Sequence, residues 1–207
     1  RTIKIGVIDS GIKDIDLGAN LGVGRDFSPD STDPSVTNDD IYGHGTRVAQ
    51  IIGALGDNDA GIAGICWEIE LIPLQVTLSD GKSYNYEARK DAFEYAEEHH
   101  IPIVNCSFGS LEEKTIGTPE QISNYSGLIV AAAGNNGREL HNTDNSGTSC
   151  HFIPACYEAD NIISVGALNA DCSASAMWGT NSGSNYGKGC VDIFAPGTGI
   201  YSYKLGE

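Results

Sequence analysis

Apolar residues gather in short runs along the 207-residue chain, and turn-forming residues separate these runs. Several of the runs are continuous rather than alternating, which is typical of strands that are covered on both faces. The pattern predicts strands over residues 3–8, 68–76, 101–108, 127–134, 161–168 and 190–197. Pro73 favours a bend or an edge position for the second strand, because proline cannot donate a backbone hydrogen bond.

Helical periodicity occupies segments between these strands. Apolar side chains recur at helical spacing over residues 44–55, and alanines mark one helical face over residues 87–100. A third, shorter helix is predicted from Thr118 as its N-cap and Pro119 at its first position. The alternation predicts a three-layer α/β fold, in which a mainly parallel sheet carries helices on both faces. No repeat, low-complexity tract or linker interrupts the pattern, so a single domain is expected over residues 1–207.

Acidic residues outnumber basic residues by 28 to 12, which gives a formal net charge of −16. Such a surface repels phosphate backbones, so nucleic acid is not expected as a partner. The simplest interpretation is a well-solvated surface, and a more specific one is a preference for basic ligands or for cations such as calcium. No run of about 18 apolar residues is present, so no membrane span is expected.

The cysteines form no Cys-x-x-Cys pair, which argues against a zinc cluster. They stand at positions 66, 106, 150, 156, 172 and 190. The first two lie in apolar runs and are expected to be buried thiols. A disulfide could join the next two, and another could join the last two, but spacing alone does not determine the pairing.

Three polar residues stand where predicted strands end or a helix begins, and ligands gather at such places in α/β folds. Asp9 ends the first strand in VIDSGI, and Asn135 follows the fourth in AAAGNNG. His44 opens a helix between two glycines in YGHGTR. Alone, His44 would be explained as a residue that fills a turn. Together with Asp9 it has a functional interpretation, because a carboxylate can hold an imidazole in the tautomer that accepts a proton.

The stretches VIDSGI, GHGTRVAQIIGA, VNCSFGS and AAAGNNG, in this order, resemble motifs of the subtilisin family of serine proteases. Shorter matches such as DNDAGIAGI and VDIFAPG fill the intervals, so the resemblance covers essentially the whole chain. It implies a subtilisin-like fold and a serine-type endopeptidase that cleaves peptides or proteins through an acyl-enzyme. It also implies that Asp9 orients His44, that His44 acts as general base and then general acid, and that Asn135 donates to the oxyanion.

Two short segments would bind the substrate according to the resemblance: Ser107, Phe108 and Gly109 in one, and Ala132, Ala133 and Gly134 in the other. The first would form a strand edge that pairs with an extended peptide. The second would line the pocket for the residue before the scissile bond. Its small residues leave room for a large apolar or aromatic side chain.

A calcium site is implied at Asp16 and Asn58, with carbonyl groups from the loop GDNDAGI. Oxygen ligands suit calcium, although a solvated acidic turn would have the same composition. The family's additional N-terminal ligand has no counterpart in these residues. Arg47 and Gln50 also depart from the family, which commonly has histidine and glycine there.

The family's nucleophile stands in a Gly-Thr-Ser motif that opens a buried helix. The GTS stretch ending at Ser149 has these residue types, but bulky His151 and Phe152 follow it, and it precedes the strand in DIFAPG. Ser149 is therefore expected to lie in a loop beside the substrate pocket and not to be the nucleophile. No such motif follows Gly197, so the serine is expected in a C-terminal segment or a second chain. Residues 1–207 alone are not expected to form an acyl-enzyme.

Two other classes of function remain open from the sequence. A non-catalytic pseudoprotease would keep the fold and bind peptides in the cleft, in keeping with the absent serine. A nucleotide-binding or phosphoryl-transfer domain would use Asp9 as its active carboxylate. However, no P-loop or Gly-x-Gly-x-x-Gly motif opens a helix after the first strand, and the negative charge opposes phosphate binding.

Overall fold

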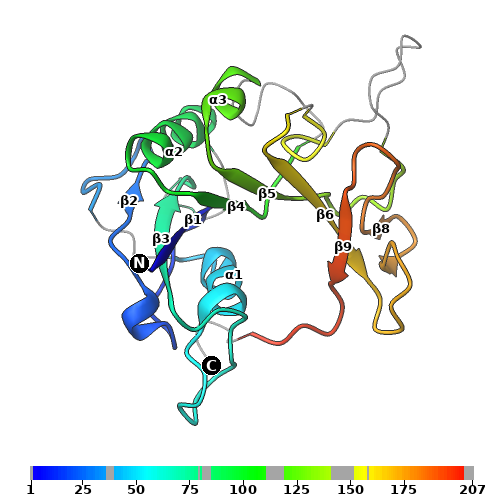
Figure 1. The fold of residues 1–207 in the computed structure, drawn as a ribbon, viewed down its shortest axis with the longest axis horizontal. Coiled ribbons are helices and arrows are strands. Elements are labelled where there is room, and N and C mark those ends of the chain that lie inside the picture. Colours follow the sequence, from blue (N-terminus) through cyan, green and yellow to red (C-terminus); the bar gives the residue numbers. More distant parts are fainter. Residues whose placement is uncertain are drawn as a thin grey trace. The chain divides into compact units, whose positions relative to one another are not determined.

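The computed structural model describes residues 2–35, 40–78, 80, 85–110, 119–140, 152–157 and 159–202. The chain divides into two compact units. Unit 1 comprises Arg1–Asn105, Asn124–Gly127 and Tyr201–Glu207, and unit 2 comprises Cys106–Ser123 and Leu128–Ile200. Both units are built on parallel strands (Figure 1).

Unit 1 contains parallel strands in the order β2 (Arg25–Asp26), β3 (Ile69–Gln75), β1 (Ile3–Asp9) and β4 (Ile103–Cys106). In this register, Val7 of β1 lies opposite Pro73 on one side and opposite Asn105 on the other. Strand β1 is therefore an inner strand, and Asp9 at its carboxyl end pairs with Gln75 of β3.

Pro73 does not mark an edge, because β3 lies between β1 and β2. The amide of Val76 donates to Asp9 on β1, whereas the carbonyl of Gln75 accepts from Phe27 beside β2. Since backbone groups alternate along a strand, the nitrogen of Pro73 faces β2. Strand β2 pairs with β3 only at Leu74 and Gln75, so the missing N–H falls outside this short ladder.

A cluster of buried apolar residues joins helix α1 (His44–Gly53) to one face of these strands. It comprises Val7, Ile12, Leu17, Ala49, Ile69 and Leu71. Side chains alternate between the two faces of a strand, so Asp9 shares the face of Val7 and lies on the side of α1. Helix α2 (Tyr86–Glu98) contacts β1 and β3 and lies on the other side of these strands in Figure 1. The short helix η1 (Gly18–Asn20) precedes β2.

Unit 2 contains parallel strands in the order β5 (Leu128–Ala132), β6 (Ile162–Leu168) and β9 (Ile193–Pro196). An antiparallel pair, β7 (Met177–Gly179) and β8 (Ser182–Gly183), precedes β9. Helix α3 (Pro119–Asn124) precedes β5. The alternation of strands and helices that the sequence predicted is therefore present, while β2, β7 and β8 were not predicted.

The expected element boundaries are close to those observed. The helix predicted over residues 44–55 ends at Gly53, and the one predicted over 87–100 runs from Tyr86 to Glu98. Pro119 is the first residue of α3 as predicted, while Thr118 lies outside the described residues. Among the helices that the described ranges contain, none has the length and apolar character needed to cross a membrane.

Two expectations about cysteines can be compared with the structure. Cys106 is buried as expected, but Cys66 is exposed, because it lies in the segment between α1 and β3 rather than in a strand. Cys172 is an exposed free thiol, so it is not bridged to Cys190. The other possible bridge, between Cys150 and Cys156, involves Cys150, which lies outside the described residues, so it stays a prediction.

Candidate active site

Asp9 and His44 form the central pair of the candidate site in unit 1. Strand β1 ends at Asp9, which is fully buried, and α1 begins at His44. The Nδ1 atom of His44 lies 2.7 Å from Oδ1 and 3.0 Å from Oδ2 of Asp9. In the neutral tautomer that donates Nδ1–H to this carboxylate, Nε2 is the proton acceptor. The His44 side chain is 32% exposed, so the ring is accessible while the carboxylate is not.

The hydrogen bond that His44 donates to Asp9 raises the pKa of His44 above the usual value of 6.5, and the charge of Asp9 adds to this effect. Burial opposes the increase, because it disfavours the charged imidazolium. Nearby charges make smaller contributions: Arg47 lowers this pKa and Asp40 raises it. Arg47, which departs from the family pattern, therefore acts on the candidate base through its charge.

Two glycines allow the end of β1 and the start of α1 to approach each other. Gly11 has a φ of 103°, a conformation that residues with a side chain rarely adopt. Gly45 lies so close to the Gly11 carbonyl that a Cβ atom there would overlap it, and this Cβ would also lie 3.0 Å from the Cβ of Asp9. The glycine after His44 is therefore required for the short distance between His44 and Asp9.

Asp40 is a buried carboxylate beside this pair, and the sequence analysis did not identify it. Its Oδ1 accepts hydrogen bonds from the Ser10 hydroxyl at 2.8 Å and the Gly43 amide at 2.7 Å. Its Oδ2 accepts from the Thr46 amide at 2.8 Å and the Thr46 hydroxyl at 2.6 Å. The Ser10 hydroxyl in turn accepts from the Gly45 amide at 3.0 Å. Asp40 thereby ties the residue after β1 to the first turn of α1.

The position of Asp40 does carry a sequence signal. A carboxylate shortly before a helix is favourable, because the first amides of the helix lack partners within the helix. Asp40 comes four positions before His44, but several acidic residues precede it in the same loop. The pattern alone could not show which of them turns inward.

Asn135 follows β5 in unit 2, and it is exposed. The backbone around it is held by the buried side chain of Asn185. The Asn185 Oδ1 accepts from the amides of Asn136 and Arg138, both at 3.1 Å, and its Nδ2 donates to the Ala133 carbonyl at 2.8 Å. The segment that carries Asn135 is therefore fixed by hydrogen bonds on both sides of it.

The two expected substrate segments also lie in unit 2. Strand β4 ends at Cys106, so Ser107, Phe108 and Gly109 follow the strand instead of extending it. After them, the amide of Ser110 donates to the Ile153 carbonyl at 3.1 Å, and the Ile153 amide donates back at 2.9 Å. In the second segment Ala132 is partly buried, whereas Ala133 and Gly134 are buried. Asp9 and His44 thus belong to unit 1, and the expected substrate segments and Asn135 belong to unit 2.

Asp16 and Asn58, the expected calcium ligands, are in contact within unit 1. The Nδ2 of Asn58 donates to Oδ1 of Asp16 at 2.5 Å. Oδ2 of Asp16 is buried and has no hydrogen-bond partner among the described residues. It lies so close to Gly61 that a Cβ atom there would overlap it. A buried carboxylate oxygen without a partner is costly, so Oδ2 of Asp16 fits a hard cation. Asn58 presents its amide nitrogen to Asp16, and its Oδ1 accepts from the Ala60 amide at 3.2 Å.

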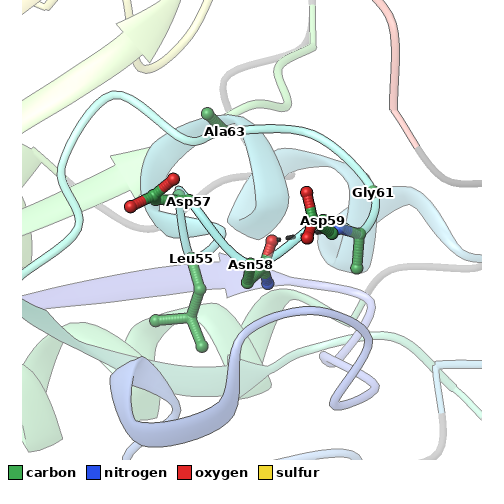
Figure 2. A pocket seen from close by; sticks show the side chains of 8 residues that line it. Leu55, Asp57, Asn58, Asp59, Gly61 and Ala63 are labelled. Carbon is green, nitrogen blue, oxygen red and sulfur yellow. Dashed lines mark hydrogen bonds between the residues drawn. The ribbon is translucent and has the colours of Figure 1, made fainter.

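The loop after α1 borders a largely open pocket of about 350 Å³, which Asn58 helps to line (Figure 2). The pocket is lined by Leu55, Gly56, Asp57, Asn58, Asp59, Ala60, Gly61 and Ala63. Within the described ranges, no group of three or more His, Cys, Asp or Glu side chains is placed to hold a metal. Backbone carbonyls of this loop would therefore have to complete the coordination of any cation.

Comparison with known proteins identifies the family. The model of the subtilase family matches residues 1–206. The chain belongs to the subtilase family. It is 33% identical to an intracellular serine protease of Paenibacillus polymyxa over 98% of the chain, and 32% identical to subtilisin E of Bacillus subtilis over 97%.

Solved subtilase structures agree with the fold. The leader-peptide-processing serine protease EpiP of Staphylococcus aureus matches 95% of the chain with a TM-score of 0.73 and 22% identity. A cold-adapted subtilisin-like serine proteinase matches 97% with a TM-score of 0.71 and 22% identity. The chain thus has the three-layer α/β fold with a mostly parallel sheet, as the sequence predicted.

The subtilase chain spans only part of the proteins that it matches. It covers 58% of the Paenibacillus protease, 48% of subtilisin E and 52% of EpiP. Ser149 lies outside the described residues. Its expected place in a loop beside the substrate pocket, and not as the nucleophile, therefore stays a prediction.

Proposed function

We propose that the whole protein is a serine endopeptidase of subtilisin type. In this proposal Asp9, His44 and Asn135 belong to its catalytic machinery, and a segment outside residues 1–207 provides the serine. The observation that carries the proposal is the Asp9–His44 pair: a fully buried carboxylate, 2.7 Å from Nδ1 of an imidazole whose ring is partly exposed. Asp9 stands at the carboxyl end of an inner parallel strand, and α/β enzymes hold their reactive groups at such strand ends.

The proposed chemistry uses His44 as a proton carrier. Nε2 of neutral His44 removes the proton of the serine hydroxyl while the serine oxygen bonds to the substrate carbonyl carbon. The imidazolium then gives this proton to the leaving amine as the peptide C–N bond breaks, which leaves an acyl-enzyme. Water is deprotonated by His44 in the same way and attacks the ester, and the proton returns to the serine oxygen. Asp9 holds the ring in the required tautomer and stabilises each imidazolium.

Asn135 is proposed to stabilise the oxyanion. Its exposed position and the hydrogen bonds of Asn185 on either side of it support this role, because such a donor is effective when it is fixed beforehand. Removal of one donor of this kind costs roughly 100- to 1,000-fold in turnover. The segment 107–109 is proposed to pair with the extended peptide backbone, and the segment 132–134 is proposed to line the pocket for the residue before the scissile bond.

The sheet of unit 2 supports the existence of a further segment. Paired residues of parallel strands point to the same face. One face of β5, β6 and β9, the open face, carries Val130, Ala132, Ile163, Val165, Ala167, Ile193 and Ala195. All seven are apolar and none is fully buried, and Ile193 is 51% exposed. On the opposite face, Ile129, Ala131, Ser164 and Gly166 are buried.

Parallel sheets are ordinarily covered on both faces, so the open face requires an apolar partner. Subtilisin E is about twice as long as this chain, which spans 48% of it. We therefore infer that the serine-bearing segment packs an apolar helix on the open face. This partner can belong to the same polypeptide or to a second chain.

Calcium is the proposed cofactor, held by Asp16, Asn58 and carbonyls of the loop around the pocket in Figure 2. The unpaired Oδ2 of Asp16 supports this proposal. The ion would supply the charge that compensates the buried Oδ2 atom of Asp16 and would fix the loop after α1. It has no proposed role in the chemical steps.

The proposed function is tested by treating the full-length protein with a fluorophosphonate probe, which labels an activated serine covalently. We expect one labelled serine outside residues 1–207 and no labelling after His44→Ala. The matched control is His99→Ala, because His99 is exposed at the end of α2, where its ring bonds to the Tyr95 carbonyl of its own turn. If the folded protein takes up no label but binds peptides, it is a pseudoprotease and the proposal is wrong.

A further inference from the structure

The ring of Phe152 lies between the two segments proposed to bind substrate, within unit 2. A Cβ atom on Gly109 would overlap the ring, at 2.5 Å from its Cζ atom. A Cβ atom on Gly134 would lie 2.6 Å from the same Cζ and 2.7 Å from Cε1. One edge of the ring is therefore in close contact with a glycine from each segment.

The backbone around Phe152 is fixed to the first of these segments. Ile153 and Ser110 exchange two backbone hydrogen bonds, of 2.9 and 3.1 Å, directly after Phe152 and Gly109 respectively. The Phe152 carbonyl accepts from the amide of Cys156 at 2.9 Å. Phe152 itself is only 8% exposed, so the ring is packed in place rather than lying on the surface.

The second segment is equally constrained on its side of the ring. Gly134 has a φ of 98°, and its carbonyl accepts from the Asn185 amide at 2.9 Å. The Asn185 side chain donates to the carbonyl of Ala133 at 2.8 Å. A Cβ atom on Gly134 would also meet the Asn185 amide nitrogen at 2.5 Å. The segment therefore cannot move away from Phe152 without breaking these hydrogen bonds.

We propose that Phe152 fills the inner end of the pocket for the residue before the scissile bond, so that the protease prefers glycine, alanine or serine there. This inference rests on the proposed function and on the two segments assigned to the substrate. It reverses the expectation that the small residues at 132–134 admit a large apolar or aromatic side chain. The space beside Gly134, and beside Gly109 in the other segment, is already taken by the Phe152 ring.

The expected selectivity follows from the contacts of the ring. A large substrate side chain would have to displace a packed phenyl ring, whereas an alanine side chain would not reach it. A misfit of one methylene in an apolar pocket changes kcat/KM by roughly 10- to 200-fold, and a phenyl group is much larger than one methylene. We therefore expect discrimination of about 100-fold or more against phenylalanine relative to alanine.

The test uses the full-length protein and a series of peptide substrates that differ only in the residue before the scissile bond: alanine, leucine or phenylalanine. We expect kcat/KM to be highest for alanine, and Phe152→Ala to raise the ratio of phenylalanine to alanine by at least about 10-fold. Phe152→Leu should give an intermediate ratio. Phe194→Ala is the matched control, because it also removes a phenyl ring, but from β9. It should leave the ratio of kcat/KM for phenylalanine to that for alanine unchanged.

The outcomes separate this inference from the proposed function. Absence of cleavage of every peptide together with absence of probe labelling would contradict the proposed protease. Cleavage with a wild-type preference for phenylalanine would overturn only the role of Phe152, as would an unchanged ratio in Phe152→Ala. The wild-type series decides the question by itself if Phe152→Ala does not fold.

Discussion

At the scale of single residues, the properties of His44 come from two opposing environments. The buried carboxylate of Asp9 favours the imidazolium, while burial of the ring disfavours it, and the net result is a raised pKa. A general base has to be neutral before it can accept a proton. The raised pKa is therefore expected to lower activity at mildly acidic pH, where His44 is protonated. At higher pH His44 is neutral, and Asp9 holds it in the orientation of a general base.

Asp9→Asn is predicted to lower the pKa of His44, because it removes the two largest favourable contributions to the charged ring. In the full-length protein, activity should fall as the pH decreases through the His44 pKa, and this inflection should move to lower pH in the variant. The plateau activity should drop by about 10⁴-fold, the size of the loss when the analogous triad carboxylate is made neutral. A pH profile of kcat/KM and NMR titration of His44 measure both effects.

The control for this prediction is Asp171→Asn, which removes an exposed carboxylate in unit 2 that accepts from Ser173. It should leave the His44 titration and the pH profile unchanged. A His44 titration that is unaffected by Asp9→Asn would contradict the assignment of the pair.

Asp40→Ala is predicted to destabilise the protein strongly. It leaves the amides of Gly43 and Thr46 and the hydroxyls of Ser10 and Thr46 without their acceptor in a buried site. Each unsatisfied buried group costs about 1–3 kcal/mol, so a loss of at least about 3 kcal/mol in the free energy of unfolding is expected. Denaturant titration of the full-length protein measures it.

Asp33→Ala is the matched comparison for Asp40→Ala, because Asp33 accepts from the amide and hydroxyl of Ser35 on the exposed surface. Its effect on the denaturation midpoint should be much smaller. Equal shifts of the denaturation midpoint in the two variants would show that the buried hydrogen bonds of Asp40 stabilise the protein no more than the exposed ones of Asp33.

The sequence identified Asp9 and His44 but not Asp40 or Phe152, and the difference has a physical reason. Asp9 and His44 stand in local motifs whose glycines, Gly11 and Gly45, are visible in the sequence. The roles of Asp40 and Phe152 depend on contacts with residues far away in the chain, such as Ser10 and Gly109. The side chain of Phe152 was visible as bulky, but its location between two glycines was not.

At the scale of elements, long apolar runs were easier to predict than short strands. β1, β3 and β6 each contain seven residues with a largely apolar pattern. Their predicted bounds differ from the observed ones by one residue, at one end in β1 and β6 and at both ends in β3. β2 has only two residues, and the β7–β8 pair contains a register shift. Such short strands are determined by their partners rather than by periodicity, so the sequence carries little signal for them.

The open face of β5, β6 and β9 gives a prediction at this scale. If the serine-bearing segment covers this face in the full-length protein, Ile163→Ala and Ile193→Ala remove buried side chains. Each should then lower the free energy of unfolding by about 2–5 kcal/mol. An exposed isoleucine would instead cost about 0.5 kcal/mol or less. Thermal or denaturant unfolding of the full-length protein distinguishes the two cases.

Ile65→Ala is the control, because Ile65 is 82% exposed and belongs to unit 1 rather than to the sheet of unit 2. It should have little effect. Small effects at both Ile163 and Ile193 would show that nothing packs on the open face, and the proposed position of the serine-bearing segment would be wrong.

At the scale of the whole molecule, the net charge of −16 and the unpaired carboxylate oxygen of Asp16 both favour a bound cation. The two effects can be separated, because general repulsion is screened by any salt, while a site selects its ion. This distinction matters for the calcium proposal, since any divalent ion would reduce repulsion among the acidic residues to some extent.

We predict that calcium raises the melting temperature of the full-length protein through Asp16 and Asn58. A ligand at 100 times its Kd adds about 2.7 kcal/mol of stability, which corresponds to roughly 5–10 °C for a chain of this size or somewhat larger. Magnesium at equal ionic strength should give a smaller increase, because it requires a tighter octahedral arrangement. Asp16→Ala should abolish the calcium-specific part, while Asp171→Ala should retain it. An increase that is equal for both ions and for both variants would mean that calcium acts only by screening the negative charge.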